Sequence, residues 1–279
     1  MDSISFITAH FSDFDWTRCW LDRIIRYTDS SLIHEILIIN QDRTIKSYEK
    51  LSRLNQKVKV LEYPANETII AKQGHDHAYV LNLAVQEAQG KYVCIMDSDC
   101  HPISRQWIGE CQSLFQEFDV IAAVDYYKLK NESQLLTHPC FLMFYRQAID
   151  FPIRFDEGLF EQNVDTGRLI GKQMEKAGKM IYYAIPEKSF NSYWGFVYLR
   201  SVYHHERGSY RKADIRLRKQ IDWRQRFFKN IVISKERYYL SKSESFYYQL
   251  RSRTIPRSKK KLIRFLSLPI RMYNKFKRS

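Results

Sequence analysis

The chain of 279 residues carries a net charge of +14, and 44% of its residues are hydrophobic and 15% aromatic. This composition excludes a disordered chain, and the length suffices for one large domain or for one domain with an appendage. No run approaches the ~20 apolar residues of a membrane-spanning helix, and the start lacks the positive charge of a signal peptide, so we expect a cytoplasmic protein or one on the cytoplasmic face of a membrane.

Strands and helices alternate along the first hundred residues. Apolar runs predict strands at 5–9, 35–40, 58–63 and 91–96, and helical periodicity predicts helices at 16–27, 45–55 and 77–89. Asp13 or Asp15 can cap the first of these helices. This order is typical of an α/β domain with a mostly parallel sheet flanked by helices.

The same pattern continues further along the chain. Further strands are predicted at 120–124, 139–144 and 181–185, and helices at 105–117 and 166–177. Gly178 is a good stop for the last helix. The five cysteines are odd in number and form no Cys-x-x-Cys pair, which predicts reduced and mostly buried thiols.

Two acids directly follow the apolar strand 91–96. Asp97 and Asp99 flank Ser98, and two carboxylates so close repel each other unless a cation joins them. Mg²⁺ usually takes one or two protein carboxylates and fills its other positions with substrate phosphates and water. The pair therefore predicts a divalent ion that clamps a diphosphate, although such acids also serve as turn or capping residues. The neighbouring Cys100 would suit zinc better than a phosphate-bound magnesium.

Polar residues follow the other predicted strands as well. Thr8, Ala9 and His10 end the first strand, and Asn40-Gln41-Asp42 ends the second. Parallel sheets bind ligands at the carboxyl ends of their strands, so we expect these residues beside Asp97 and Asp99.

Residues 3–210 resemble glycosyltransferases of the GT-A fold, close to family 2. The resemblance depends on the order of several motifs: Ile4–Ala9, Asn40-Gln41-Asp42, Gly74–Ala78 with Leu81-Asn82, Ala88–Val93, Asp97-Ser98-Asp99, Phe155-Asp156-Glu157 with Val164-Asp165, and His204–Gly208. It implies a metal-dependent transferase that moves one sugar from a nucleotide-sugar to a hydroxyl of a glycan or lipid-linked acceptor.

The resemblance also implies roles for single residues in the transfer step. Asp99 and Asp97 would hold Mn²⁺ or Mg²⁺, which stabilises the leaving diphosphate. Asp165 would take the proton of the acceptor hydroxyl and give inversion, with Glu157 and Glu161 as rivals for the base. As the first residue before helix 166–177, Asp165 can also be a helix cap.

Other residues are expected around the donor. The adjacent His204 and His205 resemble a late histidine motif, and one of them is a candidate third metal ligand. Arg207 could neutralise phosphate. His77 and Asn82 are expected to line the donor pocket with Thr8, Ala9, His10 and Ser98. Asp42 can accept the ring N–H of uridine, which cytidine lacks, so a UDP-sugar is expected.

The C-terminal region is strongly basic. Residues 200–279 hold 24 Lys and Arg against 5 Asp and Glu, whereas residues 1–199 hold 21 against 26. We therefore expect a transferase domain at 1–210 and a basic, aromatic-rich, helical extension at 211–279. Within it, residues 256–279 mix cations with leucines and aromatics, which predicts binding to an anionic membrane surface.

Two other functions stay open at this point. A nucleotidyltransferase acting on sugar phosphates also clamps phosphates with paired acids, but it would normally have a glycine-rich loop that the stretch 8–15 lacks. Binding of nucleic acid through the basic C-terminal region is the second alternative, but it leaves the acidic motifs of the body unexplained.

Overall fold

The computed structural model describes residues 2–10, 13–41, 45–63, 76–124, 135–158, 166–186, 195–205, 229 and 231–238. The chain divides into two compact units, Met1–Lys188 with Gly195–Arg211, and Ser189–Trp194 with Lys212–Ser279. The helices and strands labelled below all lie in the first unit. In the second unit, residues 231–235 are helical, while most of the basic extension lies outside the described residues. The domain boundary at residue 210 stays a prediction.

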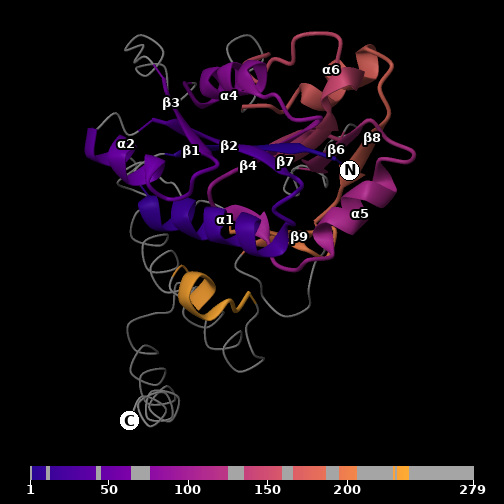
Figure 1. Ribbon diagram of the computed structural model, residues 1–279. Helices are drawn as coiled ribbons and strands as arrows, with labels where there is room; N and C mark the ends of the chain where they lie inside the picture. Colours follow the sequence, from indigo (N-terminus) through magenta and orange to yellow (C-terminus); the bar gives the residue numbers. More distant parts are fainter. Residues whose placement is uncertain are drawn as a thin grey trace, which may run out of the picture. The chain divides into compact units, whose positions relative to one another are not determined.

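A seven-stranded sheet forms the centre of the first unit (Figure 1). Its strands are β1 (Ile4–His10), β2 (Ile33–Asn40), β3 (Val58–Glu62), β4 (Tyr92–Met96), β6 (Val120–Val124), β7 (Thr137–Tyr145) and β8 (Ile181–Ala184). Their order is β3-β2-β1-β4-β7-β6-β8, and β7 runs antiparallel to β4 and β6 while the other pairs are parallel. The mostly parallel sheet predicted from the sequence is therefore confirmed.

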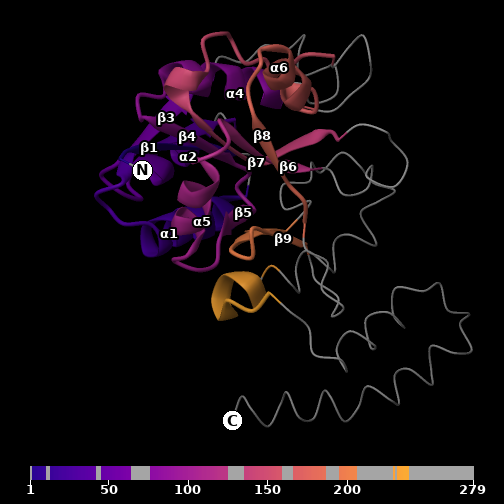
Figure 2. The same ribbon diagram turned by 90° about the vertical axis from the view of Figure 1, so that its right-hand side faces the viewer.

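Helices cover both faces of this sheet, as Figures 1 and 2 show. On one face lie α1 (Phe14–Tyr27), α2 (Ile45–Ser52) and α5 (Trp107–Leu114), and on the other α4 (Asp76–Glu87) and α6 (Ile170–Lys176). A short 3-10 helix, η1 (Arg146–Ala148), follows β7. The first face packs Trp20 and Trp107 against Phe6, and the second packs Leu81 and Met174 against strand residues. Burial of these large side chains stabilises the layers by about 1.5–3 kcal/mol each.

Local signals explain two helix ends, the start of α1 and the end of α6. The Asp13 carboxylate accepts a hydrogen bond from the Trp16 amide at 3.3 Å and caps α1, so the prediction for Asp13 is confirmed. Gly178 follows α6 with a φ of 71°, and Lys179 N–H bonds to Met174 O at 2.9 Å, which closes the helix. The predicted start of this helix at 166 is wrong, because Gly167 has a φ of 69° and residues 166–169 form turns before Ile170.

A second, three-stranded antiparallel sheet was not predicted. Its strands β5 (Cys100–Pro102), β10 (Val202–His204) and β9 (Phe196–Tyr198) lie side by side in that order. Each strand has three residues, too few to show the alternation by which a strand is recognised in a sequence. This sheet joins the segment after Asp99 to residues about a hundred positions later.

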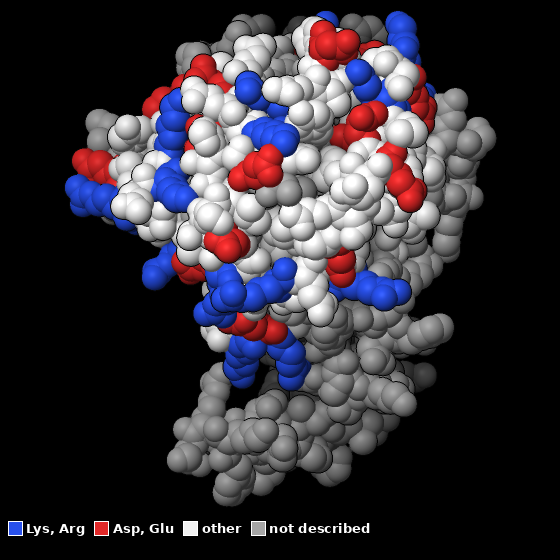
Figure 3. All heavy atoms as spheres, turned by 45° about the vertical axis from the view of Figure 1, so that its right-hand side comes forward, with Lys and Arg blue, Asp and Glu red and all other residues white. Residues whose placement is uncertain are grey.

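The surface of the first unit carries charges of both signs. Figure 3 shows acidic and basic side chains interspersed on the face that it presents. Among the described residues, no helix has the length and apolarity that crossing a bilayer requires.

Candidate metal and donor site

The two aspartates lie where β4 ends and the chain turns toward β5. Asp97 N–H donates to Cys140 O of β7 at 3.1 Å, and Cys100 N–H donates back to Asp97 O at 2.8 Å. This turn holds the backbone on both sides of Asp99. The Asp99 side chain is buried, with 5% of its surface exposed, whereas 26% of Asp97 is exposed. The pair thus lies at the carboxyl end of a central strand, as predicted.

Strand β10 brings a histidine to this pair. His204 is in register with Cys100, and His205 N–H bonds to Asp99 O at 3.0 Å. His204 Nε2 lies 3.7 Å from Asp99 Oδ1 and 3.9 Å from Asp97 Oδ2. One ligand atom from each of the three residues lies within 4.8 Å of the others, a spacing that could hold a metal ion.

His77 of α4 also faces the aspartates. Its Nε2 lies 3.6 Å from Asp97 Oδ1. Burial alone would raise the pKa of Asp97, but the contacts with His77 and His204 outweigh burial and hold that pKa below its ordinary value. Asp97 is therefore ionised at neutral pH. Two carboxylates and one imidazole form a ligand set that suits Mn²⁺ or Mg²⁺ completed by phosphate oxygens and water.

The side chains of the adjacent His204 and His205 contact different residues. The ring of His205 lies against Trp16, with centroids 4.6 Å apart, and its Nδ1 hydrogen-bonds with Tyr203 Oη at 2.7 Å. His205 is thus held in the packing between α1 and β10. The geometry favours His204 over His205 as the third metal ligand.

Asn82 has both ends of its amide engaged within the protein. Its Nδ2 donates to Asp156 Oδ1 and its Oδ1 accepts from Phe155 N–H, each at 2.8 Å. Arg154 pairs with the same carboxylate at 2.7 Å. Asn82 therefore ties α4 to the loop that leads toward Asp165, and its contact with a donor stays a prediction.

The end of β1 lies beside this site in the sheet, because β1 pairs with β4. Thr8, Ala9 and His10 are buried, and His10 Nδ1 lies 2.7 Å from Thr17 Oγ1 of α1. Thr8 Oγ1 is buried without a hydrogen-bond partner in the described part of the chain. Ser98 is also buried, at 6% exposed.

Several predicted site residues lie outside the described residues. They are Asp42, Glu161, Asp165 and Arg207. Glu157 is described and exposed. The roles suggested for these residues stay predictions.

The sequence did not show what surrounds His204 on its other side. His138 and Cys140 of β7 lie against it, and they too form a cluster with ligand atoms within 4.8 Å of one another. The sequence offered one signal, a histidine two residues before a cysteine at the start of a strand, because their partner His204 comes 64 residues after Cys140.

A model of glycosyl transferase family 2 matches residues 6–168, more than half of the chain. The chain therefore belongs to this family. The resemblance stated from the motifs is confirmed. No curated protein sequence matches the chain significantly.

A solved structure shares the fold, and a second is reported for its similarity. The mannosyltransferase PcManGT of Pyrobaculum calidifontis, in complex with GDP-Man and Mn²⁺, is similar with a TM-score of 0.51 and 16% identity over 64% of this chain and 54% of that one. TarS (residues 1–349) of S. aureus with UDP-GlcNAc has a TM-score of 0.46 and 14% identity over 67% and 59% of the two chains. The chain thus spans a little over half the length of these two proteins.

Proposed function

We propose that the chain transfers a single sugar from a nucleotide-sugar to a hydroxyl of a glycan or lipid-linked acceptor, with a divalent cation at Asp97, Asp99 and His204. The observation that carries the proposal is the convergence of these three side chains at the end of β4. Family membership, the paired acids and the order of the remaining motifs all support the same reaction.

The residues of the site have separable tasks. When bound, the cation acts as a Lewis acid that offsets the charge gained by the leaving diphosphate. Asp97 and Asp99 supply negative oxygen ligands, and burial of Asp99 strengthens its interaction with a cation by excluding water. His77 holds Asp97 ionised and oriented. Either Mn²⁺ or Mg²⁺ fits this ligand set.

The donor base and the stereochemistry are proposed from the sequence. Asp42 would accept the ring N–H of uridine, which favours a UDP-sugar. Asp165 would take the acceptor proton from the side opposite the leaving group, which gives inversion. Thr8, His10, Ser98 and Arg207 would complete the donor pocket.

The acceptor proposal depends on the basic segment 256–279. Its cations and apolar residues suit an anionic lipid surface, where each cation near the surface contributes about 1 kcal/mol. We propose that this segment holds the enzyme on the cytoplasmic face of the plasma membrane, close to a lipid-linked acceptor.

The donor site can be tested by thermal unfolding with UDP, GDP, CDP and dTDP, each with and without Mn²⁺. A ligand that binds only the folded state stabilises it by about 2.7 kcal/mol at 100 times its dissociation constant. We expect one nucleotide, UDP, to raise the unfolding temperature in a metal-dependent manner. Asp99→Asn, which keeps the shape but removes the charge, should abolish this shift.

The control variant is Asp22→Asn, which neutralises an exposed acid on α1. It should behave as wild type. A nucleotide shift that needs no metal, or that persists in Asp99→Asn, would contradict the proposed site.

A further inference from the structure

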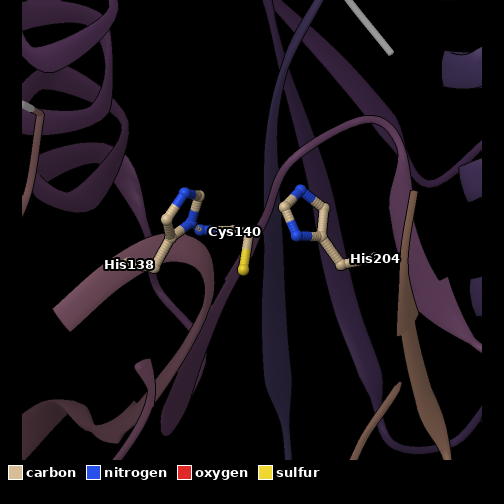
Figure 4. Close-up of side chains that lie close together, drawn as sticks. All are labelled: His138, Cys140 and His204. Carbon is tan, nitrogen blue, oxygen red and sulfur yellow. Dashed lines mark hydrogen bonds between the residues drawn. The ribbon is translucent and has the colours of Figure 1, made fainter. Parts of the chain in front are cut away.

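A cluster of nitrogen and sulfur ligand atoms also includes His204. Figure 4 shows Cys140 Sγ between the imidazole rings of His138 and His204. One ligand atom from each residue lies within 4.8 Å of the others, and the two ring centroids are 5.4 Å apart. Cys140 is fully buried and forms no disulfide.

His204 presents a different nitrogen to each group. Its Nε2 lies near Asp97 and Asp99, at 3.9 and 3.7 Å. Its Nδ1 is turned toward the Cys140 side chain in Figure 4 and is buried without a well-formed hydrogen bond in the described part of the chain. This nitrogen interacts with the Cys140 side chain, so both atoms already face the place where a thiolate-preferring metal ion could bind.

The chemistry of these atoms differs from that of the aspartate pair. Thiolate and imidazole are preferred ligands of Zn²⁺, whereas Mg²⁺ and Mn²⁺ prefer carboxylate and phosphate oxygens. Cys140 would bind as thiolate and release its proton to the solvent. His138 Nδ1 accepts the Cys140 amide at 3.1 Å, and a metal ion would have to replace this one hydrogen bond to use the nitrogen. The buried thiol of Cys100 interacts with Cys140 and is a candidate for a fourth ligand.

We propose that His138, Cys140 and His204 form a second metal site that takes Zn²⁺ or another thiolate-preferring divalent cation. The site shares His204 with the proposed catalytic ion, and this part of the inference rests on the proposed function. A neutral imidazole carries one lone pair. When zinc occupies Nδ1, Nε2 carries the proton and can only donate a hydrogen bond to Asp97 or Asp99. Zinc at this site therefore weakens binding of the Mn²⁺ or Mg²⁺ ion. Zinc would thereby inhibit the proposed transfer reaction.

Cobalt titration tests the site without any enzymatic readout. Co²⁺ replaces zinc, and a thiolate ligand gives it an intense near-ultraviolet absorption band. We expect one equivalent of Co²⁺ to produce this band in wild type, in Asp99→Asn and in Cys111→Ala, which removes another buried thiol. Cys140→Ser should lose the band. No band in wild type, or an unchanged band in Cys140→Ser, would overturn the proposal.

A second variant, His138→Gln, keeps the proposal testable if Cys140→Ser does not fold. His138→Gln changes a side chain that is only partly buried, and it should weaken Co²⁺ binding at least about tenfold while the circular dichroism spectrum stays that of wild type. Unaltered Co²⁺ affinity in a folded His138→Gln would remove His138 from the site.

Competition between the two ions is read from the electron paramagnetic resonance signal of free Mn²⁺. One equivalent of Zn²⁺ should release clearly more bound Mn²⁺ from wild type than from Cys140→Ser, in which only direct displacement at the aspartates remains. Equal release from both proteins would overturn the sharing of His204. If Mn²⁺ does not bind wild type at all, the proposed catalytic site fails, whereas the cobalt band still decides the thiolate site.

Discussion

Asp156 illustrates how one buried side chain fixes the geometry near the site. Only 6% of its side chain is exposed, and it accepts hydrogen bonds from Asn82 of α4 and from Arg154. Burial would raise the pKa of Asp156, but Arg154 and Asn82 together hold it below the ordinary value. The carboxylate therefore holds residues 154–156 against α4.

Replacement of Asp156 should lower stability in a pH-dependent manner. Because its folded pKa is depressed, its contribution is present above the unfolded pKa, near 3.8, and is lost as pH falls through the folded value. Asp156→Ala removes the acceptor of Asn82 Nδ2 and the partner of Arg154, so we expect a loss of about 1–3 kcal/mol at neutral pH by urea unfolding. The difference from wild type should shrink as the pH falls below 4. A loss that is equal at all pH values would show that packing, and not charge, is responsible.

At the scale of elements, the small sheet decides which side chains meet. β5 continues the chain from Asp99, and β10 returns His204 to the same place. Strand β9 supports β10 from the other side, where Gly195 lies against the backbone of His204. A Cβ atom at Gly195 would come 1.8 Å from His204 O, so only glycine fits there.

Gly195→Ala should therefore separate β9 from β10 and displace His204. We expect lower stability together with weaker Mn²⁺ binding, measured by unfolding and by electron paramagnetic resonance. The matched control is Gly109→Ala on α5, where an added Cβ meets nothing within 4 Å. The control should raise stability by about 1 kcal/mol, since alanine favours a helix over glycine. Wild-type Mn²⁺ affinity in Gly195→Ala would contradict the role given to this sheet.

The large sheet and the small sheet differ in how far a sequence reveals them. The apolar runs of β1, β2, β4 and β6 are long enough to be recognised as strands from their own residues. Asp97 and Asp99 directly follow one of these runs, β4. The choice between His204 and His205 depends on packing against Trp16, which lies almost two hundred residues earlier. The neighbourhood of Cys140 and His204 depends in the same way on pairing between distant strands.

At the scale of the whole molecule, the uneven charge of the chain is the basis for proposing a separate partner for the basic C-terminal region. The acidic body contains the transferase fold, and the basic C-terminal region provides most of the positive charge. A truncation after residue 255 removes the segment proposed to bind lipid. We expect the full chain to float with vesicles that contain anionic lipid, less so at high salt, and the truncated chain to stay in solution. Equal flotation of both chains would contradict the membrane proposal.

The central claim is that sugar transfer depends on a cation held by Asp97, Asp99 and His204. The most direct test measures release of nucleoside diphosphate from the nucleotide-sugar, with Mn²⁺ and after chelation, in wild type, Asp99→Asn and Asp22→Asn. We predict metal-dependent release in wild type and in Asp22→Asn, and a loss of about a hundredfold or more in Asp99→Asn. Release that survives chelation, or equal rates in Asp99→Asn and wild type, would contradict the account.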